Sequence, residues 1–148
     1  MRMIFVNLPV KDIARSREFF AALGFSFNDA FSDDHAAHVV IEENIGVMLL
    51  TEERFKDFIN GPVADADAGT EVLVCLSADS RKEVDDLLSR ALAAGAEPWK
   101  PVTDEGPMYG ASFRDIDGHV WEVMYMDMEA MAASMSADKD AARAPAGA

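Results

Sequence analysis

Hydrophobic and polar positions along the chain follow the order strand, helix, three strands. Residues 3–10 place apolar side chains at alternate positions, which is the period of a strand with one buried face. A helical repeat of apolar residues follows, from the N-cap candidate Asp12 to Gly24, where a helix can end. Three short strands are then predicted at 25–29, 37–42 and 45–50, and a short helix from Thr51.

The same order starts again after residues 61–69, which have the composition of a linker. Residues 70–77 alternate, with Val72, Val74 and Leu76 on one face and Glu71, Leu73 and Cys75 on the other. A capping box formed by Ser80 and Glu83 opens a helix that ends at Gly95. Strands are predicted at 97–103, 108–114 and 119–126, and the Asp117-Gly118 pair between the last two is typical of a hairpin.

Two consecutive βαβββ modules therefore predict an α+β fold. Each module has an open sheet edge, so we expect the modules to pair and form a curled mixed sheet around a cleft, with the helices outside. The predicted domain covers residues 1–126, with modules at about 1–60 and 69–126. Residues 127–148 form an Ala/Met-rich tail, for which we expect fraying or docking on a partner.

Composition narrows the class of protein. The 27 acidic residues exceed the 13 Lys and Arg residues, giving a net charge of -14, which argues against a nucleic-acid partner. No apolar run approaches the roughly 20 residues of a membrane span, so no membrane partner is expected. The single cysteine, Cys75, cannot form an intramolecular disulfide, which is typical of the reducing cytoplasm.

Two segments resemble the vicinal oxygen chelate superfamily, which includes glyoxalase I, bleomycin- and fosfomycin-resistance proteins and extradiol dioxygenases. Residues 7–25 resemble the opening strand and helix of that family, with Asp12, Ser16 and Phe20 at the motif positions. Residues 113–122 resemble its closing hairpin, which ends in Glu122. The resemblance implies the fold with a ligand cleft, and a homodimer, but no single reaction.

Metal-using members of that family direct one ligand from each of four strands into the cleft. The resemblance places these positions at Phe5, at Leu49 (or Met48, one register away), at Glu71 (or Leu73), and at Glu122. Phenyl, aliphatic and thioether side chains do not bind a hard divalent cation. We therefore expect no metal or other cofactor; if a divalent metal is present, Glu71 and Glu122 are its candidate ligands, and a dimer partner could add others.

Histidines elsewhere in the chain do not replace the missing ligands. We interpret His119, beside the hairpin turn, as a surface residue. His35 and His38 lie in or beside the third strand and are interpreted as solvated, although His38 could reach the rim of the cleft.

A cleft without these ligands becomes an apolar pocket with a few polar anchors, the usual design of a small-molecule site. Phe5 and Leu49 are its expected walls. The predicted anchors, with Trp99 at the rim, are Asn7, Glu71, Cys75, Glu122, Tyr109, Ser112 and Arg114. Glu122 is the candidate catalytic residue, as a general acid or base. Alternatively, Glu122 is a structural acceptor for Arg114 or Tyr109. Trp121, on the opposite face, is expected to pack under a helix. Cys75 is expected to be an inert thiol.

The sequence is compatible with two functions. The first is a metal-independent protein that binds a small aromatic or apolar molecule in the cleft. The alternative is a metal-dependent lyase, transferase or dioxygenase with an atypical ligand set. A protein that acts only through its dimer surface is a third possibility.

Overall fold

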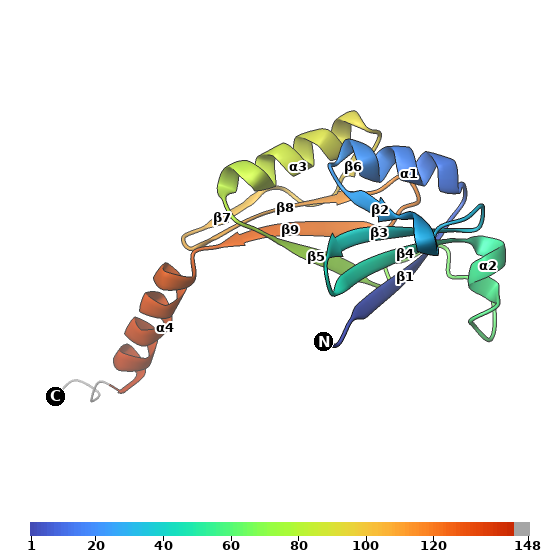
Figure 1. Cartoon of the computed structure of the whole chain (residues 1–148). Helices are drawn as coiled ribbons and strands as arrows, with labels where there is room; N and C mark the ends of the chain where they lie inside the picture. Colours follow the sequence, from blue (N-terminus) through green and yellow to red (C-terminus); the bar gives the residue numbers. More distant parts are fainter. Residues whose placement is uncertain (144–148) are drawn as a thin grey trace.

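Two βαβββ modules form the body of the protein in the computed structural model, which describes residues 1–143 (Figure 1). The first contains β1 (Ile4–Val10), α1 (Ile13–Ala22), β2 (Ser26–Asn28), the short 3-10 helix η1 (Asp29–Phe31), β3 (Ala36–Glu42), β4 (Ile45–Thr51) and α2 (Glu52–Lys56). The second contains β5 (Leu73–Ala78), α3 (Arg81–Ala93), β6 (Glu97–Pro98), β7 (Thr103–Glu105), β8 (Met108–Arg114) and β9 (Val120–Met126), and α4 (Met128–Arg143) follows it. The α+β class and the duplicated order of elements are confirmed.

Each module has its own mixed sheet. The strand orders are β1-β4-β3-β2 and β5-β9-β8-β6, with β7 paired to β8. In both sheets the first strand runs parallel to the last strand of the module, and the other pairs are antiparallel. The strand predicted at 97–103 is interrupted between β6 and β7, where Pro98 and Pro101 cannot donate to a ladder.

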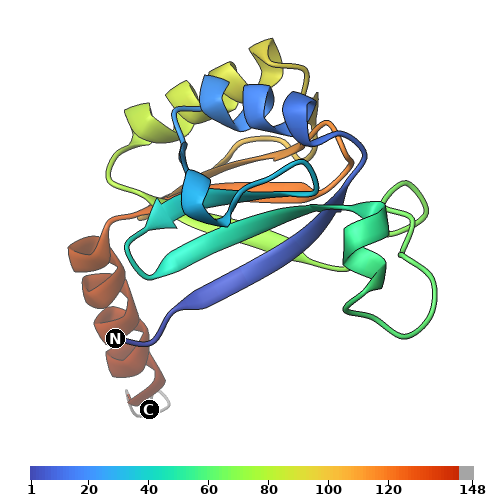
Figure 2. The same cartoon turned by 45° about the vertical axis from the view of Figure 1, so that its right-hand side comes forward.

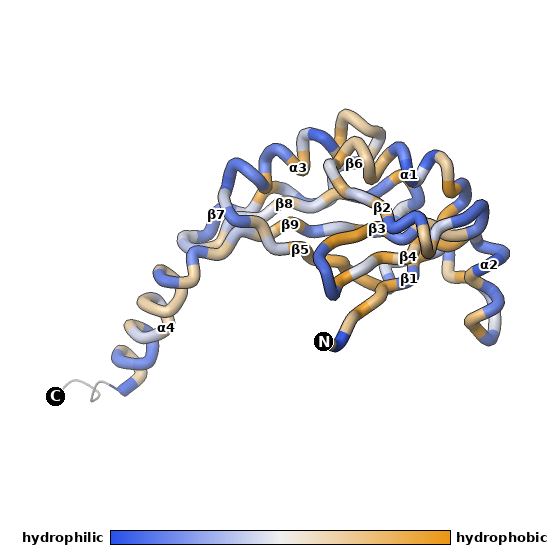
Figure 3. The backbone as a smooth tube through the Cα atoms, in the orientation of Figure 1, coloured by the Kyte–Doolittle hydropathy of each residue, from blue (hydrophilic) through white to orange (hydrophobic). Residues whose placement is uncertain are grey.

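Helices α1 and α3 lie side by side over one side of the two sheets, as Figure 1 shows. The core lies beneath them, and the hydropathy view in Figure 3 shows hydrophobic residues concentrated in β1, β3 and β4. Phe20 of α1 packs on Trp121 of β9, with ring centroids 5.2 Å apart, and Phe19 lies 6.4 Å from Phe113 of β8. The helix of the first module thus packs on the sheet of the second, and Trp121 lies under a helix as predicted.

A tight hairpin between β8 and β9 organises the junction. Gly118 has φ of +88°, a backbone conformation that residues with a Cβ rarely adopt, as the Asp-Gly pair predicts. The buried carboxylate of Asp115 accepts hydrogen bonds from Trp121 Nε1 at 2.9 Å and from the backbone N–H groups of Asp117 and His119. Burial raises the pKa of Asp115, and these donors lower it in part.

The same hairpin is bonded to the first module. The carboxylate of Asp117 accepts from the backbone N–H of Lys11 at 2.9 Å and from Ser16 Oγ at 3.4 Å. The ring nitrogen Nε2 of His119 lies 2.6 Å from the carbonyl oxygen of Pro9. The interpretation of His119 as a surface residue is therefore wrong, because its ring joins the two modules.

Helix α4 leaves the body at the end of β9 (Figures 1 and 2). Its first turn is fixed by Asp127, whose side chain accepts from the N–H of Ala130, but it has no buried residue. The tail is thus helical over 128–143 rather than frayed from its start, and residues 144–148 lie outside the described part. Among residues 1–143, no helix is both long and apolar enough to cross a membrane.

Replacement of Trp121 by Phe should lower the free energy of unfolding by about 2–4 kcal/mol, because it leaves an oxygen of buried Asp115 without its donor and reduces the packed volume. Chemical denaturation of both proteins measures this difference. Trp99→Phe is the matched control, since Trp99 is partly exposed. Equal effects of the two substitutions would contradict the role assigned to the Trp121–Asp115 hydrogen bond.

Candidate functional site

Each sheet has an open face, on the side away from α1 and α3. In the first sheet one row of paired residues crosses this face, from Asn7 in β1 to Met48 in β4 and His38 in β3. In the second sheet the corresponding row runs from Cys75 in β5 to Glu122 in β9 and Ser112 in β8.

The two rows are equivalent positions of the duplicated module. Asn7 lies five residues before Asp12, whose side chain accepts from the N–H of Arg15 and caps α1. Cys75 lies five residues before Ser80, which caps α3 in the same way. The same scaffold position therefore carries different chemistry in the two modules.

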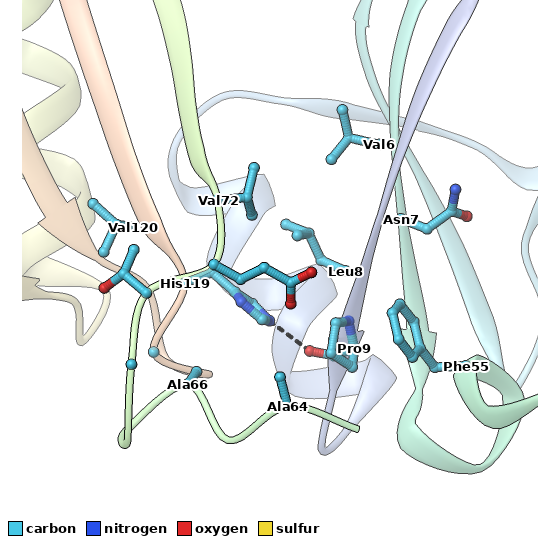
Figure 4. A pocket seen from close by; sticks show the side chains of 14 residues that line it. Val6, Asn7, Leu8, Pro9, Phe55, Ala64, Ala66, Val72, His119 and Val120 are labelled. Carbon is cyan, nitrogen blue, oxygen red and sulfur yellow. Dashed lines mark hydrogen bonds between the residues drawn. The ribbon is translucent and has the colours of Figure 1, made fainter. Parts of the chain in front are cut away.

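A pocket of about 200 Å³ lies between the sheets, where β1 faces β5 and β9 (Figure 4). We call it the seam pocket. It is lined by Val6, Asn7, Leu8, Pro9, Phe55, Ala64, Ala66, Gly69, Thr70, Glu71, Val72, Gly118, His119 and Val120. Its walls are mostly apolar, so it combines hydrophobic surface with a few polar groups, as small-molecule sites do.

The polar groups of the seam pocket come from three separate segments. Asn7 lies on β1, Glu71 precedes β5, and His119 follows the hairpin. The predicted anchors Asn7 and Glu71 are thus brought together. Sequence reasoning missed His119 and Phe55; the only signal was the Gly- and Ala-rich linker, whose small residues line one side.

Leu49 and Tyr109 were predicted to line the site, and the structure places both outside it. Leu49 has no exposed surface and belongs to the core under the helices, whereas its neighbour Met48 faces the open side. Tyr109 lies on the helix side of β8, where its hydroxyl donates to Asp85 at 2.6 Å and the guanidinium of Arg81 lies 4.9 Å from its ring. Neither residue can contact a ligand on the open face, because strand side chains alternate between faces.

Arg114 is held by carboxylates rather than free for a ligand. Its guanidinium is 2.7 Å from Asp67 in the linker and 3.4 Å from Glu97, and lies 5.8 Å from the ring centroid of Trp99. It therefore fastens the linker to the second sheet. Its carboxylate partners are Asp67 and Glu97, not Glu122, which the sequence analysis offered as one acceptor.

Glu71 and Glu122 lie apart. Cys75 is the strand partner of Glu122, and Glu71 lies four residues earlier, a separation of about 13 Å along an extended chain. Glu71 belongs to the seam pocket, and Glu122 to the open face beside Cys75 and Ser112. Burial raises the pKa of Cys75, and the nearby charge of Glu122 raises it further. The thiol is therefore poorly ionised at neutral pH, in line with the inert role expected for it.

His38 is not solvated as the sequence analysis interpreted it. Its side chain is only 6% exposed and lies against Phe5, with ring centroids 5.5 Å apart. Phe5 is on the open face and 44% exposed, but it does not line the seam pocket, of which it was predicted to form a wall. His35 lies in the exposed turn before β3.

This fold and the sequence match a known family. The model of the Glyoxalase/Bleomycin resistance protein/Dioxygenase superfamily matches residues 2–123. The chain belongs to this superfamily. A comparison with curated protein sequences found no match.

Several solved structures share the fold. A hypothetical protein, SA1046 from S. aureus, is 26% identical with a TM-score of 0.72, over 84% of this chain and 94% of that one. A superfamily enzyme from Burkholderia phytofirmans PsJN is 19% identical with a TM-score of 0.70, over 85% and 99% of the two chains. The fosfomycin resistance protein FosX from Listeria monocytogenes, complexed with Mn(II) and sulfate, is 18% identical with a TM-score of 0.65, over 90% and 96%.

The helix caps identify which residues of this chain stand at the superfamily's metal positions. Phe5 lies seven residues before the N-cap Asp12, and Leu73 lies seven residues before the equivalent N-cap Ser80. Of the two alternatives for the fifth strand, the duplication therefore favours Leu73 over Glu71.

Of Leu49 and Met48, the duplication favours Met48, because it pairs with Asn7 as Glu122 pairs with Cys75. With Glu122 itself as the fourth position that the resemblance implies, the four side chains offer one carboxylate in total. In residues 1–143 no group of three or more His, Cys, Asp or Glu residues lies close enough to hold a metal ion. This donor set does not fit a hard divalent cation, which needs at least three protein ligands.

Replacement of Glu122 by Gln should lower the pKa of Cys75 and speed its alkylation by iodoacetamide at pH 8, because a neighbouring negative charge is removed. The measurement is the rate of alkylation as a function of pH, at the only cysteine of the chain. Glu71→Gln is the matched control and should leave the profile unchanged. A larger effect of Glu71→Gln than of Glu122→Gln would mean that Glu71, and not Glu122, is the carboxylate near Cys75.

Proposed function

We propose that the protein binds a small aromatic or apolar molecule in the seam pocket without a metal ion. The observation that carries this proposal is the pocket itself, with apolar walls and the polar groups of Asn7, Glu71 and His119 at one place. Binding would bury the ligand between the modules, where the hydrophobic effect supplies most of the free energy.

The size and charge of the seam pocket limit the ligand. About 200 Å³ is less than the roughly 300–1,000 Å³ of sites for drug-sized molecules, so a single ring fits better than a fused system. Within the described part of the chain, the lining holds the carboxylate of Glu71 and no Lys or Arg. A neutral or cationic ligand is therefore preferred over an anion.

Two observations favour binding without a metal. Phe5, Met48 and Leu73 occupy three of the four superfamily metal positions, and none of them supplies a hard donor. The remaining carboxylate, Glu122, lies on the open face and does not line the seam pocket. The Mn(II) of FosX belongs to that protein, and a metal-dependent lyase, transferase or dioxygenase is the alternative that the experiment below distinguishes.

Three ligands with the same ring and different charges test the proposal: benzylamine, benzyl alcohol and benzoate. We expect the amine and the alcohol to bind at pH 7 and benzoate to bind more weakly, because Glu71 repels it. Val72→Trp should weaken binding of the alcohol by about tenfold or more by filling the pocket. Isothermal titration calorimetry measures each affinity.

Val102→Trp is the matched control, because Val102 is exposed to a similar extent and does not line the pocket. It should leave the affinities unchanged. Adding Mn²⁺, Ni²⁺, Zn²⁺ or Fe²⁺ should change neither Tm nor affinity. Stoichiometric bound metal that disappears in Glu122→Gln, together with binding that depends on it, would overturn the proposal in favour of the metal enzyme.

We further propose a homodimer in the cytoplasm, with the interface at the open faces. The support is three large apolar side chains that lie on these faces and are at least a third exposed: Phe5, Leu73 and Met126. Exposed apolar surface on this scale is typical of interaction sites. The single, thiol-form Cys75 is compatible with a reducing compartment.

Sedimentation velocity tests the dimer. The native protein should sediment as a species of twice the chain mass, and the double variant Phe5→Glu with Leu73→Glu should be a monomer, because buried unpaired charges oppose association. Phe58→Glu and Met135→Glu are the controls, because both side chains are exposed and lie outside the two sheets. A native protein that is monomeric at all micromolar concentrations would contradict the proposal.

A further inference from the structure

Three of the four hydrogen-bonding groups of His119 are occupied within the protein. Its backbone N–H donates to the side chain of Asp115 at 3.0 Å, and its backbone carbonyl accepts from the N–H of Asp115 at 2.8 Å. Its ring nitrogen Nε2 lies 2.6 Å from the carbonyl oxygen of Pro9. These contacts fix both the backbone and the ring of His119, and only Nδ1 is left.

The contact with Pro9 decides the tautomer of this imidazole. A carbonyl oxygen can only accept a hydrogen bond, so Nε2 of His119 must carry a proton and donate it to Pro9. A neutral imidazole has a single N–H group. Nδ1 is therefore an acceptor with an unused lone pair, and the protein itself selects that state.

The Nδ1 atom of His119 is also open to a ligand. Within residues 1–143, the one buried side-chain nitrogen or oxygen without a hydrogen-bond partner belongs to His38, so the unpaired Nδ1 of His119 has accessible surface. The ring lines the seam pocket. Figure 4 shows it pointing from the hairpin towards Pro9, among the other side chains that line the pocket.

Fixed acceptors dominate the polar lining of the seam pocket. Its polar side chains are those of Asn7, Thr70, Glu71 and His119. The amide of Asn7 and the hydroxyl of Thr70 can both donate and accept, whereas the carboxylate of Glu71 and Nδ1 of His119 can only accept. A ligand that matches this lining must therefore supply a hydrogen-bond donor.

We propose that His119 is a specificity-determining residue of the seam pocket, and that it selects single-ring ligands that carry an O–H or N–H donor. The donor binds Nδ1 of His119, and the ring packs against the apolar lining, which includes Val6 and Leu8. This inference rests on the proposed function, because it concerns the ligand of the same pocket. It adds the group that the ligand must carry: aromatic alcohols and amines match the pocket, and hydrocarbons and ethers do not.

The hydrogen bond discriminates because a ligand without a donor leaves Nδ1 unpaired in a site from which it has displaced water. Sites built to bind an O–H or N–H group reject analogues that lack it for this reason. The ring of His119 is already fixed by Pro9, so the ligand loses no affinity to ordering that side chain. We expect a discrimination of about tenfold.

Two isomeric ligands and one substitution test the proposal. Benzyl alcohol and anisole have the same atoms and one ring, but only benzyl alcohol has an O–H group. In the variant His119→Gln, the amide nitrogen of Gln can replace Nε2 as the donor to Pro9, and no group replaces Nδ1. The affinity ratio of benzyl alcohol to anisole, measured by calorimetry, should be about tenfold higher in the native protein than in this variant.

The ratio is the informative quantity, because the different hydrophobicity of the two ligands cancels between the two proteins. His35→Gln is the matched control in the exposed turn before β3, and it should leave the ratio unchanged. An equal ratio in the native protein and His119→Gln would overturn the role of His119 and leave binding in the seam pocket intact. Binding of neither ligand to the native protein would overturn the proposed function, and this inference with it.

Histidine side-chain NMR gives a readout that does not depend on the folding of a variant. In native protein with ¹⁵N-labelled histidine at pH 8, Nε2 of His119 should carry the proton and Nδ1 should be unprotonated before a ligand is added. Benzyl alcohol should then shift the Nδ1 resonance in a saturable way, and anisole should not reproduce this shift. A proton on Nδ1 in the free protein, or an unshifted Nδ1 when calorimetry shows that benzyl alcohol is bound, would overturn the proposal.

Discussion

The hydrogen bonds from the β8–β9 hairpin to the end of β1 and the start of α1 hold the two modules together. In residues 1–143 the two sheets share no ladder, so their relative position depends on Asp117, on His119 and on the aromatic packing of α1 against the second sheet. Pro9 pairs with Leu50 of β4, but it has no N–H group and its carbonyl oxygen lies 2.6 Å from His119 Nε2, so it offers no backbone donor to a strand of the second sheet. The edges of the sheets therefore stay apart, and the gap that this leaves is the seam pocket. The same constraint that joins the modules also creates the cavity between them.

Duplication gave the protein two copies of one open face, and the copies have diverged in chemistry rather than in geometry. Asn7 and Cys75 hold equivalent positions, as do Met48 and Glu122. The ladders and the helix caps are kept in both modules because they determine whether the module folds. Side chains on the open face are not constrained in this way, because they point away from the core. A fold that places metal ligands in other members of its superfamily can thus carry apolar and polar side chains suited to direct binding, since function belongs to the site and not to the fold.

Local signals in the sequence predicted most of the fold, and long-range contacts account for most errors in the site. The caps Asp12 and Ser80 and the Asp117-Gly118 turn follow from neighbouring residues alone, so the elements and the duplication could be predicted. Residues 45–50 are apolar at all positions except Gly46, so alternation could not decide between Leu49 and Met48. The hydrogen bond between Tyr109 and Asp85 and the contact of His119 with Pro9 join residues 24 and 110 positions apart. No local pattern encodes such partners, and both residues were therefore misplaced.

His38 is an exception to the rule that buried polar groups are paired. Within residues 1–143, one buried imidazole nitrogen is left unpaired, on a face that the helices do not cover. The strand pairs β1–β4 and β3–β4 fix this imidazole at a constant distance from Asn7 in the seam pocket, because all three residues of the row belong to one hydrogen-bonded sheet. An unpaired buried nitrogen costs about 1–3 kcal/mol, and the paired strands on both sides of His38 supply enough stability for the fold to carry that cost.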